Sequence, residues 1–133
     1  MNPLSAHKLS VRDAADQTGV SVYTLHYYER EGLLRTARTS SGHRRYAESD
    51  LGWIRVLTCL RQTGMPIRKM REFAELVRQD QTNIPVNVSA NIEARIKMLE
   101  AHRADVLDHI AELGRNLEHV EGKIRHYRQA LMD

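Results

Sequence analysis

A chain of 133 residues with a formal net charge of +3 has room for one small domain and an appendage. Its single cysteine excludes an internal disulfide, and no apolar run is long enough to cross a bilayer. We therefore expect a cytoplasmic protein that does not act at a membrane. Residues 1–80 carry 13 Lys and Arg against 9 Asp and Glu, whereas residues 81–133 carry 7 against 8. The positive surplus thus lies in the first part of the chain, where it favours contact with nucleic acid.

The first two predicted elements are short helices joined by a glycine turn. Ser10 and Asp13 have the spacing of a capping box, which predicts a helix from residue 11 to about residue 18. Gly19 can adopt the positive φ that ends such a helix, and Ser21 can cap the next one. That second helix ends at Gly32. Two short helices arranged in this way are typical of a helix-turn-helix.

The second helix has one apolar stripe, formed by Val22, Leu25 and Tyr28, and its opposite face is polar. That face carries hydroxyl groups, an imidazole and a guanidinium, which suit the base edges and phosphate oxygens of DNA. The candidate DNA-binding residues of this helix are Ser21, Tyr23, Thr24, His26, Tyr27 and Arg30. An ordinary surface helix in an α-hairpin is the alternative.

The segment from residue 33 to residue 46 differs in character, because arginines flank a turn of serine and glycine. The sequence Thr39-Ser40-Ser41-Gly42 is typical of a tight turn, so a β-hairpin, or wing, is predicted. Arginines on a hairpin beside a recognition helix are placed to bind phosphates. Arg38, Arg44 and Arg45 therefore join the DNA-binding candidates, and a solvated basic loop is the alternative.

Two further helices are predicted over residues 48–63 and 66–79. Pro66 suits the first turn of the second of them, since its missing N–H costs nothing there. The buried face of the first is formed by Leu51, Ile54, Leu57 and Leu60, widened by Trp53 and Val56. We therefore expect a DNA-binding domain with linker helices over residues 1–80, followed by a polar hinge over residues 81–86.

Apolar residues recur at alternating steps of four and three over residues 87–133. Five or more heptads of this pattern predict a coiled-coil helix of roughly 60 Å, whose stripe needs a second chain as partner. The predicted dimerisation residues are Leu99, Val106, Ile110, Leu113, Leu117, Val120 and Ile124. Arg103 interrupts the stripe and Gly114 lies beside it, while the flanking charges allow either a parallel or an antiparallel pair.

Taken together, these motifs resemble those of the MerR family of transcriptional regulators. The matching segments are Leu9–Val11, Gly19–Ser21, Thr24–Glu29, Gly32–Leu34, Ser41–Tyr46, Asp50–Leu51 and Gly64–Met65. The resemblance runs from about residue 9 to the end, with one departure at His26, where the family usually has an arginine that meets DNA. It implies a mainly α fold, with a winged helix-turn-helix head, a two-helix linker and a long C-terminal helix that forms an antiparallel coiled-coil dimer.

The resemblance also implies a function. Such proteins bind a palindromic operator in double-stranded promoter DNA as homodimers, and they distort it so that RNA polymerase can read both promoter elements. No cofactor or metal is expected, and the chain lacks the glycine-rich phosphate loop or metal motif of an enzyme. A DNA-binding architectural coiled-coil protein without sequence preference is the alternative.

Cys59 is the remaining candidate for the receptor of a signal. Its surroundings are similar to the single-cysteine branch of the family, the aldehyde- and nitrosative-stress regulators often called NmlR or AdhR. The resemblance implies that Cys59 senses reactive electrophiles, and Arg55, one turn earlier, would favour the reactive thiolate. A buried cysteine that only fills the core is the alternative.

Overall fold

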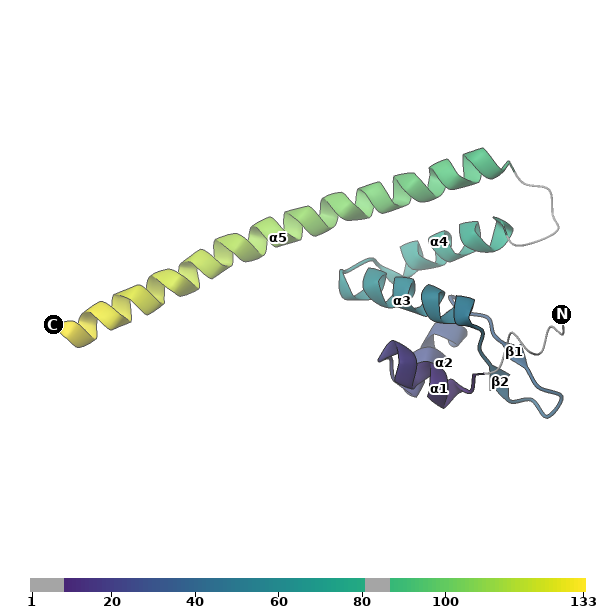
Figure 1. The fold of residues 1–133 in the computed structure, drawn as a ribbon. Coiled ribbons are helices and arrows are strands. Elements are labelled where there is room, and N and C mark those ends of the chain that lie inside the picture. The colour runs from purple at the N-terminus through teal and green to yellow at the C-terminus, as the bar shows by residue number, and fades with distance from the viewer. Residues whose placement is uncertain (1–8, 81–86) are drawn as a thin grey trace. The chain divides into compact units, whose positions relative to one another are not determined.

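The computed structural model describes residues 9–80 and 87–133, which form helices and one two-stranded hairpin (Figure 1). Their bounds are α1 Val11–Thr18, α2 Val22–Arg30, β1 Ala37–Arg38, β2 Arg44–Arg45, α3 Glu48–Gln62, α4 Ile67–Asp80 and α5 Val88–Met132. The chain divides into two compact units, Met1–Ile92 and Glu93–Asp133, and each is described by itself. The predicted mainly α fold, with a head, a wing and a long last helix, is confirmed.

The helix-turn-helix is held by the caps that the sequence predicts. The Ser10 hydroxyl accepts the Asp13 N–H at 3.1 Å, and the Asp13 carboxylate accepts the Ser10 N–H at 3.1 Å. Gly19 ends α1 with a φ of 71°, and its N–H donates to the carbonyl of Ala15. Ser21 then caps α2 by accepting the Thr24 N–H at 3.1 Å. These local bonds satisfy backbone groups that the ends of short helices otherwise leave unpaired.

The core of the first unit lies where α1 meets α2 and α3 and where α3 meets α4. Its fully buried aliphatic side chains include Leu25, Ile54 and Leu57. Ala14 is also fully buried, and its small side chain lets α1 lie close to its neighbours. The prediction that Val56 widens this core is wrong, because its side chain lies off the stripe of α3 and is 40% exposed.

The wing is a short antiparallel hairpin in which Ala37 lies opposite Arg45, and Arg38 opposite Arg44. Gly42 closes its turn with a φ of 87°. At the base of the hairpin, Leu9 and Tyr46 exchange two backbone hydrogen bonds of 3.1 and 2.8 Å. The chain segment just before α1 is therefore joined to the returning arm of the wing.

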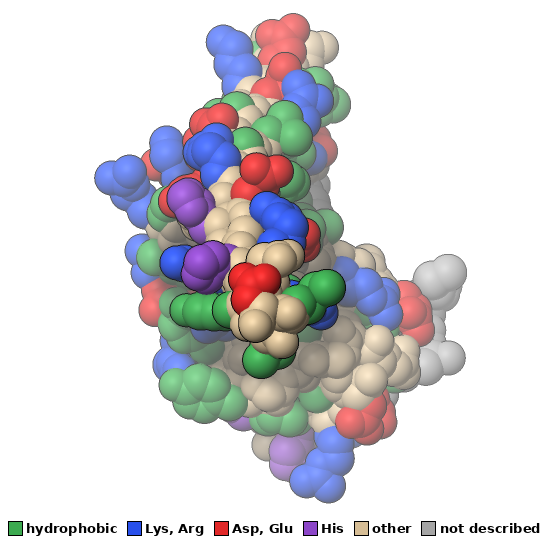
Figure 2. All heavy atoms as spheres, turned by 90° about the vertical axis from the view of Figure 1, so that its left-hand side faces the viewer, with side chains coloured by type: hydrophobic (Ala, Val, Ile, Leu, Met, Phe, Trp, Pro, Cys, Tyr) green, Lys and Arg blue, Asp and Glu red, His purple; other side chains and the backbone are tan. Residues whose placement is uncertain are grey.

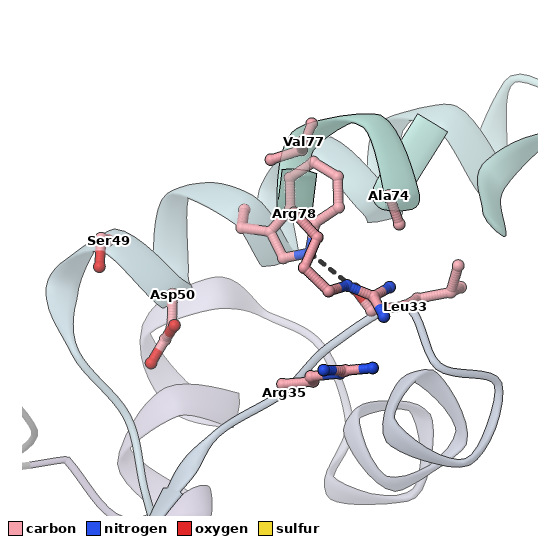
Figure 3. Close-up of a pocket in the computed structure, with 8 residues that line it drawn as sticks. Leu33, Arg35, Ser49, Asp50, Ala74, Val77 and Arg78 are labelled. Atoms are coloured by element: carbon pink, nitrogen blue, oxygen red, sulfur yellow. Dashed lines mark hydrogen bonds between the residues drawn. The ribbon is translucent and has the colours of Figure 1, made fainter. Parts of the chain in front are cut away.

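The linker helices hold the segment that follows α2. The indole N–H of Trp53 donates to the carbonyl of Leu33 at 2.7 Å, and the Arg78 guanidinium donates to the carbonyl of Gly32 at 2.8 Å. Trp53 also stacks on Phe73, with ring centroids 6.0 Å apart. Beside these contacts lies a pocket of about 360 Å³, into which Arg35 projects from the chain below the two helices (Figure 3). The predicted hinge, residues 81–86, lies outside the described residues.

Helix α5 is continuous over 45 residues, which corresponds to about 68 Å. Its first turn belongs to the first unit, where the Asn91 side-chain amide donates to the carbonyl of Leu76 in α4 at 2.9 Å. The remainder, from Glu93 onward, forms the second unit by itself. The predicted long helix is therefore confirmed, with a length slightly greater than expected.

Candidate nucleic-acid interface and dimer surface

The outer face of α2 presents an aromatic and a cationic side chain together. Tyr23 is 72% exposed, and the guanidinium of Arg30 lies over its ring, 5.7 Å from the centroid. Thr24 is half-buried and receives a hydrogen bond from the Ser21 hydroxyl at 2.9 Å. Ser21 is thus committed to capping, whereas Tyr23 and Arg30 are open to a ligand. A stacked cation of this kind is suited to a phosphate or a base edge.

The wing is fixed to α2 through one carboxylate. Glu29 accepts the Thr36 hydroxyl at 2.6 Å and forms an ion pair with the guanidinium of Arg44. Its side chain is only 13% exposed, so water screens these contacts weakly. Arg44 therefore has a positioning role that the sequence did not predict, in addition to the predicted contact with phosphate. Arg38, opposite Arg44 in the hairpin, is exposed and donates to the carbonyl of Gly42 at 3.0 Å.

A basic hollow lies between the start of α1, the helix α2 and the wing. Its lining side chains come from Ser10, Val11, His26, His43, Arg44 and Arg45. The structure thereby brings His26 of α2 next to two of the three predicted wing arginines. The surface that lines this hollow is mostly apolar, and Arg44 is already paired with Glu29, so the hollow brings basic residues together without itself forming an anion site.

Tyr46, at the base of the wing, is fully buried. Burial, reinforced by the charge of Glu29 and opposed by that of Arg44, raises the pKa of its hydroxyl to about 12. The hydroxyl has no hydrogen-bond partner among the described residues. Tyr46 therefore stays protonated at neutral pH and acts as part of the core that supports the wing.

Arg61 is a candidate contact that the sequence interpretation missed. Its guanidinium, in the last turn of α3, lies over the ring of Tyr27 in α2, 5.1 Å from the centroid. The two residues are 34 positions apart, so no local pattern in the sequence indicates their meeting. This contact adds a further cation to the surface that Tyr27 occupies.

Cys59 is exposed, so the alternative that it fills the core is wrong. It lies on α3 between Leu57 and Leu60, which are both buried, and thus off the apolar stripe. The guanidinium of Arg55 donates to the carbonyl of Gln17 at 3.1 Å and so holds α3 to the end of α1. The expectation that Arg55 serves the thiol therefore gains no support from this geometry.

The apolar stripe of α5 lies open along the second unit. Figure 2, with the C-terminal end of α5 towards the viewer, shows hydrophobic side chains exposed among charged ones. Exposed fractions of its members run from 40% for Leu99 to 88% for Leu131. The exposed residues of the stripe after Glu93 are Ile96, Leu99, Ile110, Leu113, Leu117, Val120, Ile124, Tyr127 and Leu131. A contiguous apolar face of this extent is typical of a surface that another chain covers.

Among residues 9–80 and 87–133, no three His, Cys, Asp or Glu side chains come together in a way that could hold a metal ion. None of the helices that these residues form is both long and apolar enough to span a membrane.

This chain is similar to known proteins in both its sequence and its fold. Residues 9–76 match the model of the MerR HTH family regulatory proteins, which covers the helix-turn-helix, the wing, α3 and most of α4. An uncharacterized HTH-type transcriptional regulator of Haemophilus influenzae is 38% identical over 119 residues, 88% of this chain and 82% of the relative. The Bacillus subtilis regulator AdhR is 30% identical over 93 residues, 69% of this chain and 66% of the relative.

Solved structures of related regulators are similar to this chain over nearly its whole length. HiNmlR, a MerR family regulator lacking the sensor domain and crystallised bound to promoter DNA, is 35% identical with a TM-score of 0.77. That likeness covers 91% of this chain and 90% of HiNmlR. A MerR family regulator from Listeria monocytogenes is 28% identical, with a TM-score of 0.81 over 94% of this chain and 89% of that one.

Proposed function

Since this chain belongs to the MerR family of helix-turn-helix transcriptional regulators, we propose that it binds a palindromic operator in promoter DNA as a homodimer. The observation that carries the proposal is the link through Glu29, which fixes the basic wing beside the polar face of α2. Two basic elements held in one arrangement can follow the backbone of a duplex while α2 enters the major groove.

The residues divide into two roles. Tyr23, Thr24 and Tyr27 on α2 are proposed to meet base edges and their flanking sugars, because their hydroxyl groups can both donate and accept. The proposed phosphate contacts are Arg30, Arg38, Arg44 and Arg45, together with His26, whose imidazole offers fewer N–H donors to a phosphate than a guanidinium does. Base contacts set sequence preference, whereas phosphate contacts set affinity and its dependence on salt.

The dimer is proposed to form through the stripe of α5. A pair of heads related by a twofold axis binds two half-sites, which is why the operator should be a palindrome. We further propose that the bound dimer bends and untwists the promoter in the cytoplasm so that RNA polymerase can use it. The energy of that distortion depends on the spacer sequence, even where no residue touches it.

The similarity of this chain to HiNmlR also supports the proposal. That protein lacks a sensor domain and is bound to promoter DNA, and this chain covers 90% of its length at 35% identity. A chain of this size can therefore present both elements that promoter binding requires.

A second proposal concerns the signal. The exposure of Cys59 favours a role as the receptor of a reactive electrophile, because the thiol is accessible to a small reagent. An adduct there would sit on the surface of α3, between the head and α4, and would not need to enter the core.

DNA binding can be tested with the promoter region upstream of the protein's own gene. DNase I footprinting should show one protected palindrome, and gel-shift competition should show a preference of at least about a thousandfold over random DNA. Equal competition by random DNA would instead identify an architectural protein that binds any duplex. That outcome would overturn the proposal while leaving the fold unchanged.

A further inference from the structure

The pocket between α3, α4 and the segment that follows α2 has no part in the proposed contacts with DNA or with a second chain. Its volume is about 360 Å³, near the lower end of the range for small-molecule sites. We propose that it binds a small aromatic carboxylate that carries a hydrogen-bond donor, such as a hydroxyl group, at its other end. All the lining residues belong to the first unit, so binding there does not depend on the proposed dimer.

The walls of the pocket suit a flat apolar body. Leu33, Ala74 and Val77 contribute aliphatic surface, and Trp53 contributes part of its indole ring. The indole N–H already donates to the carbonyl of Leu33 at 2.7 Å, so Trp53 offers the pocket ring surface and no free donor. An aromatic ring that packs against these walls removes apolar surface from water and needs no polar group along its sides.

Two guanidinium groups provide a place for the carboxylate. Arg35 is exposed and makes no hydrogen bond or ion pair with any described residue, so all its donors are available. Arg78 donates to the carbonyl of Gly32 at 2.8 Å and lies 3.5 Å from the carboxylate of Glu75, which still leaves N–H groups for another acceptor. The planar fork of a guanidinium matches the two oxygens of a carboxylate.

Acceptors lie at the other side of the pocket. Figure 3 shows Ser49 and Asp50 there, at the start of α3, away from Arg35 and Arg78. One carboxylate oxygen of Asp50 accepts the N–H of Ala47 at 2.8 Å, and the group can accept further hydrogen bonds. Because its charge repels a second anion, this side favours a neutral donor and directs the carboxylate of the ligand to the arginines. A phosphate, which is anionic on every side, fits the pocket less well.

A ligand held here would act on the end of the recognition helix. The carbonyls of Glu31, Gly32 and Leu33, which follow α2, accept hydrogen bonds of 3.2, 2.8 and 2.7 Å from side chains of the two linker helices. Two of the three donors, Arg78 and Trp53, also line the pocket. We therefore expect a saturating ligand to change operator affinity by about fivefold or more. This part of the inference rests on the proposed function.

Isothermal titration calorimetry with para-hydroxybenzoate tests the site in the full-length protein. We expect saturable binding of one ligand per chain, with a dissociation constant below about 1 mM. Benzoate lacks the hydroxyl donor and should bind about threefold more weakly or worse. The related para-hydroxybenzyl alcohol lacks the carboxylate and should bind more weakly still, because it cannot pair with a guanidinium.

A matched pair of arginine variants locates the binding site. Arg35→Gln removes one guanidinium from the pocket and should weaken binding of para-hydroxybenzoate by about tenfold. The residue is exposed and has no described partner, so we expect the fold to be kept. Arg68→Gln removes an exposed arginine of α4 that does not line the pocket, and it should leave the dissociation constant unchanged.

Three results would overturn the site. The first is the lack of saturable binding of both para-hydroxybenzoate and benzoate to the wild-type protein. The second is equal weakening by Arg35→Gln and Arg68→Gln, which would indicate general attraction of an anion to a basic surface. The third is competition by inorganic phosphate at equal concentration, which would identify a plain phosphate site.

Fluorescence anisotropy with labelled operator tests the effect on α2. Saturating para-hydroxybenzoate should change the affinity of the wild-type protein, and the same concentration should change that of Arg35→Gln much less. Binding of the ligand with unchanged operator affinity would overturn the link to α2. A protein that binds no operator at all would contradict the proposed function instead, and the calorimetric titration would still decide whether the pocket binds the ligand.

Discussion

Arg44 in the returning strand of the wing forms an ion pair with Glu29 in the last turns of α2. The carboxylate is 13% exposed and the guanidinium side chain 30% exposed, so the pair is partly shielded from water. Because Glu29 also accepts the Thr36 hydroxyl, it holds both arms of the hairpin. The spacing between recognition helix and wing therefore depends on a single acidic side chain.

The first prediction is that Glu29→Gln loosens the wing. The change removes the charge that pairs with Arg44 but keeps the size of the side chain, so we expect a loss of about 1–2 kcal/mol in the free energy of unfolding. Affinity for the operator should fall as well, because the wing is no longer held beside α2. Urea unfolding and fluorescence anisotropy with labelled operator measure the two effects. Glu72→Gln, which removes an exposed ion pair with Lys69, should change neither by a comparable amount.

The second prediction separates phosphate contacts from base contacts. Arg38→Ala should weaken binding to operator and random DNA alike, and should reduce the salt slope by about one unit. Tyr23→Ala should instead lower the preference for operator over random DNA. Arg38 serves this test better than Arg44, because removing Arg44 also breaks the ion pair with Glu29. An unchanged salt slope for Arg38→Ala would show that the wing does not lie along the DNA backbone.

The third prediction is that Leu117→Asp abolishes the dimer. A carboxylate in the centre of the apolar seam would have to be buried without a partner, which is strongly unfavourable. Sedimentation or light scattering should show a monomer, and operator affinity should fall with it. Arg115→Asp changes charge on the outward face of the same helix and should remain dimeric, so helix loss is controlled for.

The fourth prediction concerns the high-pH stability of the head. The pKa of Tyr46 is about 12 in the folded protein against 10 in the unfolded chain, so its contribution to stability is present below pH 10. It is lost as the pH rises through 12, because the unfolded chain releases this proton first. The difference is worth about 2–3 kcal/mol. Tyr46→Phe should remove this part of the pH dependence, and at pH 7 it should be neutral or slightly stabilising because the lost hydroxyl has no described partner.

The fifth prediction tests Cys59 as the receptor of the signal. Cys59→Ala should leave operator binding near normal, since the side chain is exposed and none of the proposed DNA contacts is removed. It should also abolish the transcriptional response to formaldehyde, quinones or nitrosating agents. A variant that responds like the wild type would show that the signal enters elsewhere.

Features that depend on neighbouring residues could be predicted from the sequence. The caps at Ser10 and Ser21 and the turn at Gly19 follow from local backbone chemistry, and the structure confirms them. Contacts between distant elements could not be predicted, because no local pattern marks the pairing of Glu29 with Arg44. The exposure of Cys59 could have been predicted from the sequence, but we did not predict it.

The spacing of the apolar residues in α3 indicates that Cys59 is exposed. Leu57 and Leu60 are both on the buried stripe, and a helix with 3.6 residues per turn turns the residue at position 59 away from it. The sequence therefore contained the information, but the usual burial of cysteines suggested the opposite. The predicted contacts of the DNA-binding residues and of the coil remain predictions that the experiments above address.

The place of Trp53 has a practical consequence for experiments on this protein. It is the only tryptophan in the sequence, its indole N–H is bonded to Leu33, and its ring is stacked on Phe73. Intrinsic fluorescence excited at the indole therefore reports on one joint, where the segment after α2 meets α3 and α4. A shift in emission on adding DNA or an electrophile would show, without any attached label, whether a signal passes through that joint.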